Sequence, residues 1–174
     1  DLCIHPDSPD RLVAGVEPGG VHVSTDAGET WEERKDGVHD DIHSLHVAGD
    51  GEYLAATGRG LYSTADAGRS WTRLDGYTEQ RYFRSVYQHD GVRYASGACV
   101  PPSDYWETSA ADPVLFRSRD GRSLEPVDSP CPGEVVVGWT SADDMLIGAT
   151  HRGTILGKRG ERWETLGELP SSET

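Results

Sequence analysis

Two stretches of this chain, forty residues apart, are nearly the same. Both follow the pattern hydroxyl-x-Asp-x-Gly-x-hydroxyl-Trp, one from Ser24 to Trp31 and the other from Thr64 to Trp71. Self-similarity at a period of roughly 20–50 residues is typical of proteins built from repeated structural units. The period constrains the fold more than any single residue does, because it requires the chain to be assembled from similar units.

Two further copies of the pattern are degenerate. The copy at Asp120 and Gly121 is one residue shorter and has Leu124 in place of tryptophan. The copy that ends at Trp163 has Lys158 in place of the aspartate. On this spacing we expect one domain, 1–174, with four repeats at about 1–36, 41–75, 82–128 and 133–167.

Each repeat contains four short apolar or alternating runs, separated by Gly and Asp. In the second repeat they fall at about 43–48, 53–57, 61–64 and 71–74. Such runs indicate strands joined by tight turns, and no window shows helical periodicity. We therefore predict an all-β chain. A period near forty residues favours a β-propeller built of four-stranded antiparallel blades, about four of them in this chain.

The repeated pattern resembles the Asp-box, or BNR repeat, of sialidases, sortilin-type receptors, xyloglucan-active glycosidases and the photosystem II assembly factor family. The resemblance implies a structural role on peripheral hairpins, away from any catalytic centre. The residues that carry it are Ser24, Asp26, Gly28, Trp31, Thr64, Asp66, Gly68, Trp71, Asp120 and Gly121.

Local physical chemistry gives the same role to these residues. An Asp or Ser before a turn accepts hydrogen bonds from the backbone two residues on, and Gly28 and Gly68 supply the positive φ of a tight hairpin. We expect Trp31 and Trp71 to start the next strand and to bury their rings against the hairpin.

One repeat is too long. Asp66 and Asp120 are 54 residues apart, and the excess lies in 97–113, between the second and third strands of the third repeat. In a propeller this loop emerges opposite the Asp-box hairpins, and long loops in compact domains are usually functional or disordered. Tyr105 and Trp106 predict an aromatic platform there; the alternative is that Trp106 caps the core of its own blade.

The same face receives the corresponding loops of the other repeats, which include Arg59 and Arg152, and the loops between repeats. The planar fork of a guanidinium group binds both oxygens of a carboxylate or phosphate, although each arginine could instead be a surface residue paired with a local acid. The candidate ligand-binding residues are Asp104, Tyr105, Trp106, Glu107, Arg59, Arg81, Arg152 and His39. Further residues nominated for this face are Glu17, Asp36, Asp40, Asp41, Tyr77, Glu79, Gln80 and Arg84.

Composition limits the partners. The net charge is −14, and Lys35 and Lys158 are the only lysines among 16 basic residues. This charge argues against nucleic acid or an anionic membrane, and no apolar run approaches the ~20 residues of a membrane span. An acid-rich, lysine-poor chain resembles cytoplasmic proteins of salt-accumulating halophiles. An ordinary acidic protein is the alternative, and a secreted protein stays open if the amino-terminal end is incomplete.

Cysteine usage predicts neither a disulfide framework nor a zinc site. Cys3, Cys99 and Cys131 are an odd number without CxxC spacing. We expect reduced thiols, with a Cys99–Cys131 pair as the alternative. No cofactor and no metal are expected.

The sequence favours a binding or scaffold module, which recognises a protein or glycan ligand on the face that carries 97–113. The alternative is a sialidase-like glycoside hydrolase with paired carboxylates on the same face, for which Asp40, Asp41, Asp104 and Glu107 are available. No Arg-Ile-Pro or other specific catalytic signature occurs. Two carboxylates converging in a pocket beside an aromatic wall would favour hydrolysis.

Propellers have four to eight blades, so four repeats either close a small ring or form part of a larger one. In the open arrangement the edges at both ends would favour self-association.

Overall fold

The computed structural model describes residues 1–76, 78–101 and 110–170, and in these ranges every regular element is a strand. The first sheet contains β1 (Leu2–His5), β2 (Ser8–Val16), β3 (Gly20–Ser24) and β4 (Glu32–Glu33). The second contains β5 (Ile42–Gly49), β6 (Glu52–Thr57), β7 (Gly60–Thr64) and β8 (Thr72–Arg73). The third contains β9 (Tyr82–His89), β10 (Val92–Ala98), β11 (Val114–Ser118) and β12 (Glu125–Pro126). The fourth contains β13 (Val136–Ala142), β14 (Met145–Thr150), β15 (Thr154–Arg159) and β16 (Arg162–Glu168).

The chain is all-β, with four four-stranded sheets whose strands follow one another in chain order. Every pairing within a sheet is antiparallel. The prediction of four-stranded antiparallel blades is therefore confirmed, and we call the sheets blades 1 to 4. No described helix is long and apolar enough to cross a membrane.

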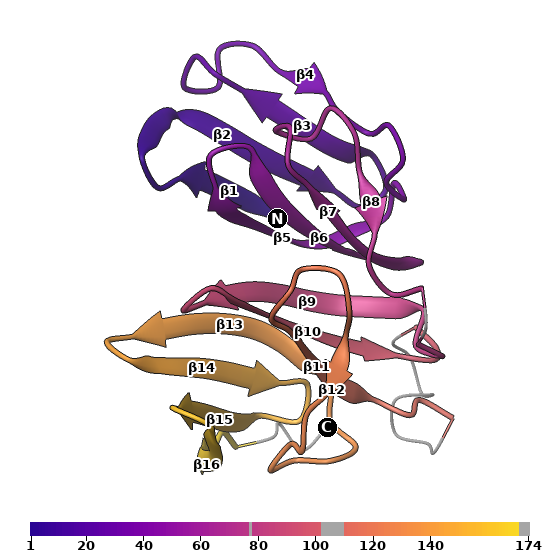
Figure 1. Cartoon of the computed structure of the whole chain (residues 1–174), viewed down its shortest axis with the longest axis vertical. Coiled ribbons are helices and arrows are strands. Elements are labelled where there is room, and N and C mark those ends of the chain that lie inside the picture. Colours follow the sequence, from indigo (N-terminus) through magenta and orange to yellow (C-terminus); the bar gives the residue numbers. More distant parts are fainter. Residues whose placement is uncertain (77, 102–109, 171–174) are drawn as a thin grey trace.

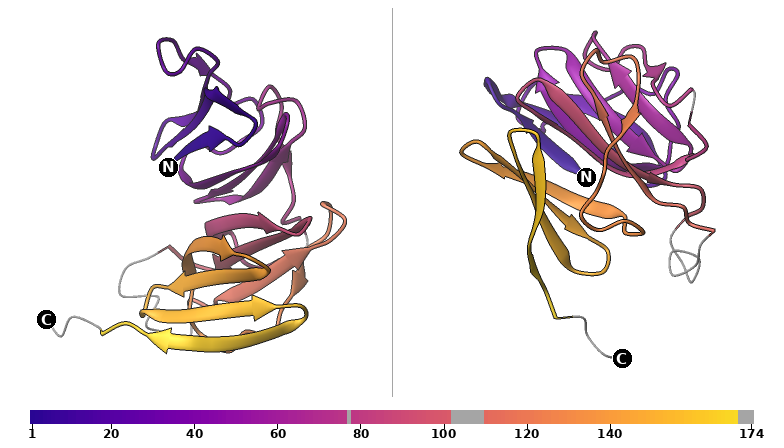
Figure 2. Two further views of the ribbon diagram at one scale, coloured as in Figure 1. Left: turned by 90° about the vertical axis from the view of Figure 1, so that its left-hand side faces the viewer. Right: turned by 60° about the horizontal axis from the view of Figure 1, so that its bottom comes forward.

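The first strand of each blade lies nearest the centre of the molecule. Strand β5 contacts β9, and β9 contacts β13. Figures 1 and 2 show the four blades succeeding one another in an open fan. The first strands therefore line the centre, and the short fourth strands lie at the periphery.

Apolar side chains fill the spaces between blades. Val13 and Val21 of blade 1 pack with Ile42 and Tyr53 of blade 2, and all four are at most 1 % exposed. Similar clusters join blade 2 to blade 3 and blade 3 to blade 4. Because apolar burial is the main favourable term in folding, the contacts between blades hold the fan together.

The two Asp-box tryptophans differ in their surroundings. Trp71 is 7 % exposed, and its indole Nε1 donates to the carbonyl of Arg34 in the preceding blade. Trp31 is 42 % exposed, and its Nε1 donates to Gly28 in its own turn. The expectation that Trp31 buries its ring is wrong, because the described chain has no blade before blade 1. Both tryptophans also precede the short fourth strand instead of starting it.

The two terminal blades each present an apolar face without a neighbouring blade. In blade 1, Leu2 pairs with Ala14 and Ile4 with Leu12, so these side chains share one face. Leu2, Ile4 and Val16 are exposed on it. We call Leu2, Ile4, Leu12, Val16 and Trp31 the blade 1 outer face.

Blade 4 has the corresponding surface. Leu146 and Leu156 are fully buried, and the adjacent Ile147 and Ile155 point the other way. Leu166 is 44 % exposed and lies against Gly157, the partner of Ile147 across the strands. We call Ile147, Ile155 and Leu166 the blade 4 outer face.

Candidate functional site

The Asp-box carboxylates are fully occupied by their own turns. Asp66 Oδ1 accepts from Thr64 Oγ1 at 2.7 Å and from the Ser70 amide at 2.9 Å, and Oδ2 accepts from Ser70 Oγ at 2.7 Å. Asp26 has the same arrangement with Ser24 and Thr30. These hydrogen bonds lower the pKa of Asp26 to about 2 and lower that of Asp66 as well.

The third box keeps this arrangement although it is one residue short. Asp120 accepts from the amides of Arg122 and Ser123 at 2.8 and 2.9 Å and from Ser123 Oγ at 2.8 Å. The fourth blade has no aspartate here, and its β15–β16 hairpin turns directly between Arg159 and Arg162. Every carboxylate of the three boxes is thus engaged in turn formation.

The boxes lie at the opposite end of the blades from the loops that join neighbouring blades. The boxes lie where first and second strands meet, since the carbonyls of Asp10, near the start of β2, and of Gly51, in the β5–β6 turn, accept from the amides of Ala27 and Ala67. At the other end, the Asp40 carbonyl accepts from the amides of Gly19 and Gly20. The turns between second and third strands therefore lie beside the interblade loops.

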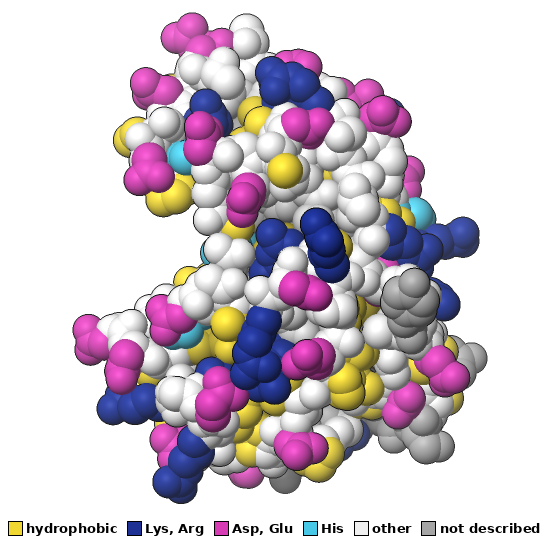
Figure 3. Space-filling model, viewed as in Figure 1, with side chains coloured by type: hydrophobic (Ala, Val, Ile, Leu, Met, Phe, Trp, Pro, Cys, Tyr) yellow, Lys and Arg dark blue, Asp and Glu magenta, His cyan; other side chains and the backbone are white. Residues whose placement is uncertain are grey.

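A groove of about 600 Å³ runs along the first strands at the centre of the fan. Its walls come from β1, β5, β9 and β13, and Figure 3 shows the surface hollowed between the first two blades and the last two. The groove combines charged groups at Asp1, Glu17 and Arg84 with the rings of Tyr87 and Trp139. Ligand sites are typically concave and mostly apolar with a few convergent polar groups, so this groove is the candidate site.

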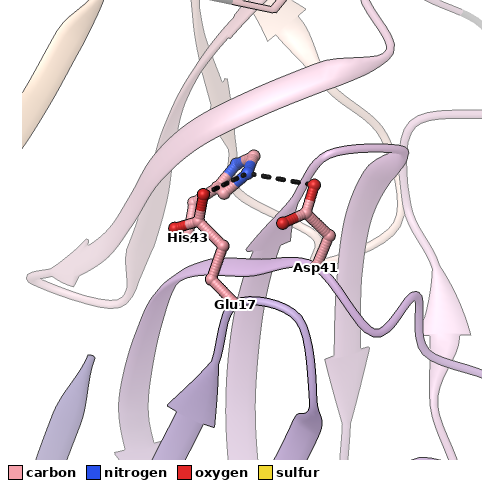
Figure 4. Close-up of side chains that lie close together, drawn as sticks. All are labelled: Glu17, Asp41 and His43. Atoms are coloured by element: carbon pink, nitrogen blue, oxygen red, sulfur yellow. Dashed lines mark ion pairs between the residues drawn. The ribbon is translucent and has the colours of Figure 1, made fainter.

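Three side chains converge where the groove reaches the interblade loops. His43 Nε2 lies 3.4 Å from Asp41 Oδ2 and 3.9 Å from Glu17 Oε1. Figure 4 shows the two carboxylates approaching the imidazole from different segments, Glu17 from the turn after β2 and Asp41 from the residue before β5. Asp41 and Glu17 are partly and largely exposed, whereas the His43 side chain is 1 % exposed.

The surroundings of His43 fix its orientation. Its Nδ1 lies 2.8 Å from the carbonyl of Phe83, and its ring lies against Tyr82 with centroids 4.4 Å apart. A carbonyl only accepts, so Nδ1 carries the hydrogen. Burial, with a contribution from the Glu17 and Asp41 charges, raises the pKa of Tyr82 to about 12.

The middle of the groove is less polar. His46 stacks on Tyr87 with centroids 4.5 Å apart, and burial lowers the pKa of His46 to about 4, so the ring is neutral at pH 7. On the opposite wall, Trp139 Nε1 donates to Ser85 Oγ at 3.0 Å. Beside it, a Cβ built on Gly138 would meet nothing within 4 Å. The groove thus has an open floor between aromatic walls.

Two of the predicted ligand-binding residues lie next to the Glu17–Asp41–His43 cluster. His39 Nδ1 accepts from the Asp41 amide, and the amide of Gly58, next to Arg59, donates to the Asp41 carbonyl. Arg59 is exposed in the β6–β7 turn. Arg152 is exposed in the corresponding turn of blade 4, so blade 3 separates the two arginines.

Arg81 is engaged in its own interblade loop. Its guanidinium donates to the carbonyls of Asp75 and Thr78 and lies 3.5 Å from the Asp75 carboxylate. Asp75 is fully buried, and Arg73 donates from Nε and Nη2 to its two carboxylate oxygens, at 2.7 and 2.8 Å. The alternative role, an arginine paired with a local acid, therefore describes Arg81.

Asp104, Tyr105, Trp106 and Glu107 lie outside the described residues, as does Tyr77. The base of the long loop is described: the Cys99 amide donates to Ala111, and Gln80 Nε2 donates to the carbonyl and carboxylate of Asp112. Cys3, Cys99 and Cys131 are free thiols, and burial raises the pKa of each.

The sequence pattern nominates Glu17, Asp41 and Arg84 for this face, whereas it places His43 in a strand and gives it no role in a site. The available signal was the spacing of Asp41 and His43, because residues two apart on an extended chain point to the same side. That spacing does not reveal Glu17, which reaches the cluster only when blade 1 packs on blade 2.

Comparisons with known proteins support this architecture. No family model matches the chain. The vacuolar protein sorting/targeting protein 10 of Emericella nidulans is 26 % identical over 137 residues, which are 78 % of this chain and 8 % of that protein. An ancestral GH74 enzyme superposes with a TM-score of 0.71 at 12 % identity, over 98 % of this chain and 28 % of that one. The chain has the fold of a β-propeller.

A third protein, the YCF48 chain of a structure described as YCF48 bound to D1 peptide, superposes with a TM-score of 0.61 at 15 % identity. The match covers 95 % of this propeller chain and 57 % of YCF48. The resemblance to sortilin-like and photosystem II assembly factor-like propellers, predicted from the repeats, is thereby supported. The propeller chain spans less than two thirds of each of these proteins.

Proposed function

We propose that this propeller chain is a binding module that holds an extended segment of a partner protein in the groove along β5, β9 and β13. The segment enters on the face that carries the 97–113 loop. The observation that carries the proposal is the groove itself, with Tyr87 and Trp139 as apolar walls and Arg84 and Glu17 as charged groups. Aromatic rings and arginine dominate the binding energy of protein interfaces.

Two further observations support a peptide in this place. The floor at Gly138 is open, which leaves room for a main chain beside the Trp139 ring. The similar fold of YCF48 occurs in a structure with a bound peptide. The Asp-box turns offer less, because their carboxylates are already hydrogen-bonded.

The proposal is tested by filling the groove with a larger side chain. Peptides that bind the intact chain are first selected from a random display library. Their affinity is then measured for the parent chain and for Gly138→Leu, whose side chain enters open space in the groove. Gly76→Leu is the matched control, since a Cβ there also meets nothing within 4 Å and Gly76 lies outside the groove. We expect at least tenfold weaker binding for Gly138→Leu alone. Equal binding by both variants would contradict the groove as the site.

Glycoside hydrolysis is the second candidate, because Glu17 and Asp41 do converge beside Tyr82. The donor atoms of the three clustered side chains all lie within 4.8 Å of one another, close to the ~5–5.5 Å of retaining glycosidases. However, both carboxylates approach His43 instead of facing each other across a space for a sugar (Figure 4). If the chain hydrolyses aryl glycosides, and if Glu17→Gln and Asp41→Asn each abolish this activity, hydrolysis is established as the function.

The outer faces of the terminal blades favour self-association. Trp31 stands where Trp71 stands in the next blade, and Trp71 packs against the blade before it. The group that Trp71 contacts in the preceding blade is Arg34, three residues after Trp31. Leu166 has the equivalent position in blade 4, three residues after Trp163. We therefore infer that the blade 1 outer face of one copy docks on the blade 4 outer face of a second. Two reciprocal contacts would close a ring of eight blades, within the range known for propellers.

A further inference from the structure

The cluster of Glu17, Asp41 and His43 brings three electron-pair donors to one point at the end of the groove. The donor atoms come from the β2–β3 turn, from the interblade loop and from β5, and they lie within 4.8 Å of one another. Figure 4 shows both carboxylates directed at the edge of the imidazole that carries Nε2. Three chain segments thus meet at this point.

The state of His43 makes the arrangement chemically specific. Because Nδ1–H donates to the Phe83 carbonyl at 2.8 Å, Nε2 of the neutral ring carries only a lone pair. That lone pair faces the oxygens of Asp41 and Glu17, which are also acceptors when ionised. Three acceptors directed at one point need a hydrogen-bond donor or a cation between them: a water molecule, a proton on Nε2 or a bound metal ion.

The surroundings match those of a metal ligand. Histidines that bind a metal usually donate their other ring N–H to a carbonyl or carboxylate, which fixes the tautomer and the orientation of the ring. His43 has this partner in Phe83 and is nearly fully buried. The backbone of Asp41 is held by Gly58 and His39. A Cβ on Gly58 would collide with the Asp41 carboxylate, so the glycine makes room for that group.

The distances need little adjustment. Two donors bound tetrahedrally to one zinc ion lie about 3.3 Å apart, given bonds of about 2.0–2.2 Å. The separation of His43 Nε2 and Asp41 Oδ2 is already 3.4 Å. Glu17 Oε1 lies 3.9 Å from Nε2, and its exposed side chain can rotate inward.

We propose that Glu17, Asp41 and His43 form a binding site for one divalent transition-metal cation such as Zn²⁺ or Mn²⁺. One imidazole and two carboxylates suit these ions, whereas Ca²⁺ takes six to eight oxygen ligands. Three protein ligands leave at least one coordination position open, as in zinc sites that bind a water or substrate. A donor atom of a ligand in the groove would fill that position, since Glu17 and His43 both line the groove. The site does not depend on the identity of the groove's partner.

Calorimetric titration of the intact chain with ZnCl₂ or MnCl₂, after removal of metal with EDTA, tests the proposal. We expect one site per chain, at least tenfold weaker in His43→Gln and in Asp41→Asn. Glu17→Gln should weaken the site as well. Loss of binding in this variant cannot be ascribed to misfolding, because the side chain is exposed and its replacement leaves the core intact. His89→Gln is the matched control: His89 lies 3.5 Å from one carboxylate, that of Asp90, but belongs to no such cluster among the described residues. It should bind metal as the parent does.

The outcome that overturns the proposal is equally specific. If only water or a proton occupies the space, the titration shows no saturable site that His43→Gln removes. Long-range ¹H–¹⁵N spectra would then show no shift of the His43 Nε2 resonance when Zn²⁺ is added. Binding retained in Glu17→Gln, Asp41→Asn and His43→Gln alike would also contradict it. Loss of the site in these three variants, with unchanged melting curves in EDTA, would support it.

Discussion

Equivalent tryptophans in successive repeats have different surroundings, and this difference is the most informative one at the scale of single residues. Trp71 fills the space between two blades and donates to the preceding one, whereas the ring of Trp31 is largely solvent-facing. A sequence pattern that repeats within the chain therefore fixes local conformation but not burial. Burial depends on whether a neighbouring blade is present.

Trp71→Ala should lower the free energy of unfolding by about 3–5 kcal/mol, as for other large aromatic deletions in cores. Trp31→Ala should cost at most about 1 kcal/mol, because little buried area is lost. Urea unfolding at low protein concentration, followed by circular dichroism, measures both. Equal losses would show that Trp31 is covered in solution.

The Asp-box carboxylates predict a pH dependence with a definite sign. The pKa of Asp26 is about 2 in the folded chain, below its ordinary value of 3.8. The stabilisation is therefore fully present above about pH 4 and is lost as the pH falls toward 2. Asp26→Asn should lower the unfolding free energy at pH 7, and the gap between variant and parent should narrow toward pH 2. A gap independent of pH would contradict this origin.

At the scale of the elements, close contact between blades depends on missing side chains. A Cβ on Gly15 in β2 would lie 2.5 Å from Ile42 Cγ2 in β5. Gly15→Val should therefore cost about 1–3 kcal/mol by overpacking the interface between blades 1 and 2. Gly49→Val is the control, since the nearest atom to its Cβ is 4.0 Å away. Thermal unfolding measures the pair, and equal melting temperatures would contradict the packing argument.

The elements were the most predictable part of the molecule. Strand alternation and the Asp-box turns are local, so the repeats around Asp26, Asp66 and Asp120 indicated four-stranded units directly. The groove cluster was not predictable in the same way, because Glu17 meets His43 only through the packing of blade 1 on blade 2. Arg81 shows the converse: the sequence placed it in the right loop, but its pairing with buried Asp75 depends on geometry.

At the scale of the whole molecule, the two outer faces predict assembly. We expect the 174-residue chain to sediment at twice the monomer mass at micromolar concentration. Because each copy carries a net charge of −14, added salt should favour the dimer by screening repulsion. Ile4→Lys and Leu166→Lys, one on each outer face, should each give monomers. Asp143→Lys, in the exposed β13–β14 turn, is the control. A parent chain that stays monomeric at high salt would contradict the assembly.

We propose that the chain binds its partner along the innermost strands, and not at the Asp-box turns that repeat in its sequence. Hydrogen–deuterium exchange of the intact chain, with and without a selected peptide, tests this most directly. We expect added protection in residues 42–49, 82–89 and 136–142, with 24–31 and 64–71 unchanged. Protection confined to the Asp-box turns, with the inner strands unaffected, would contradict it.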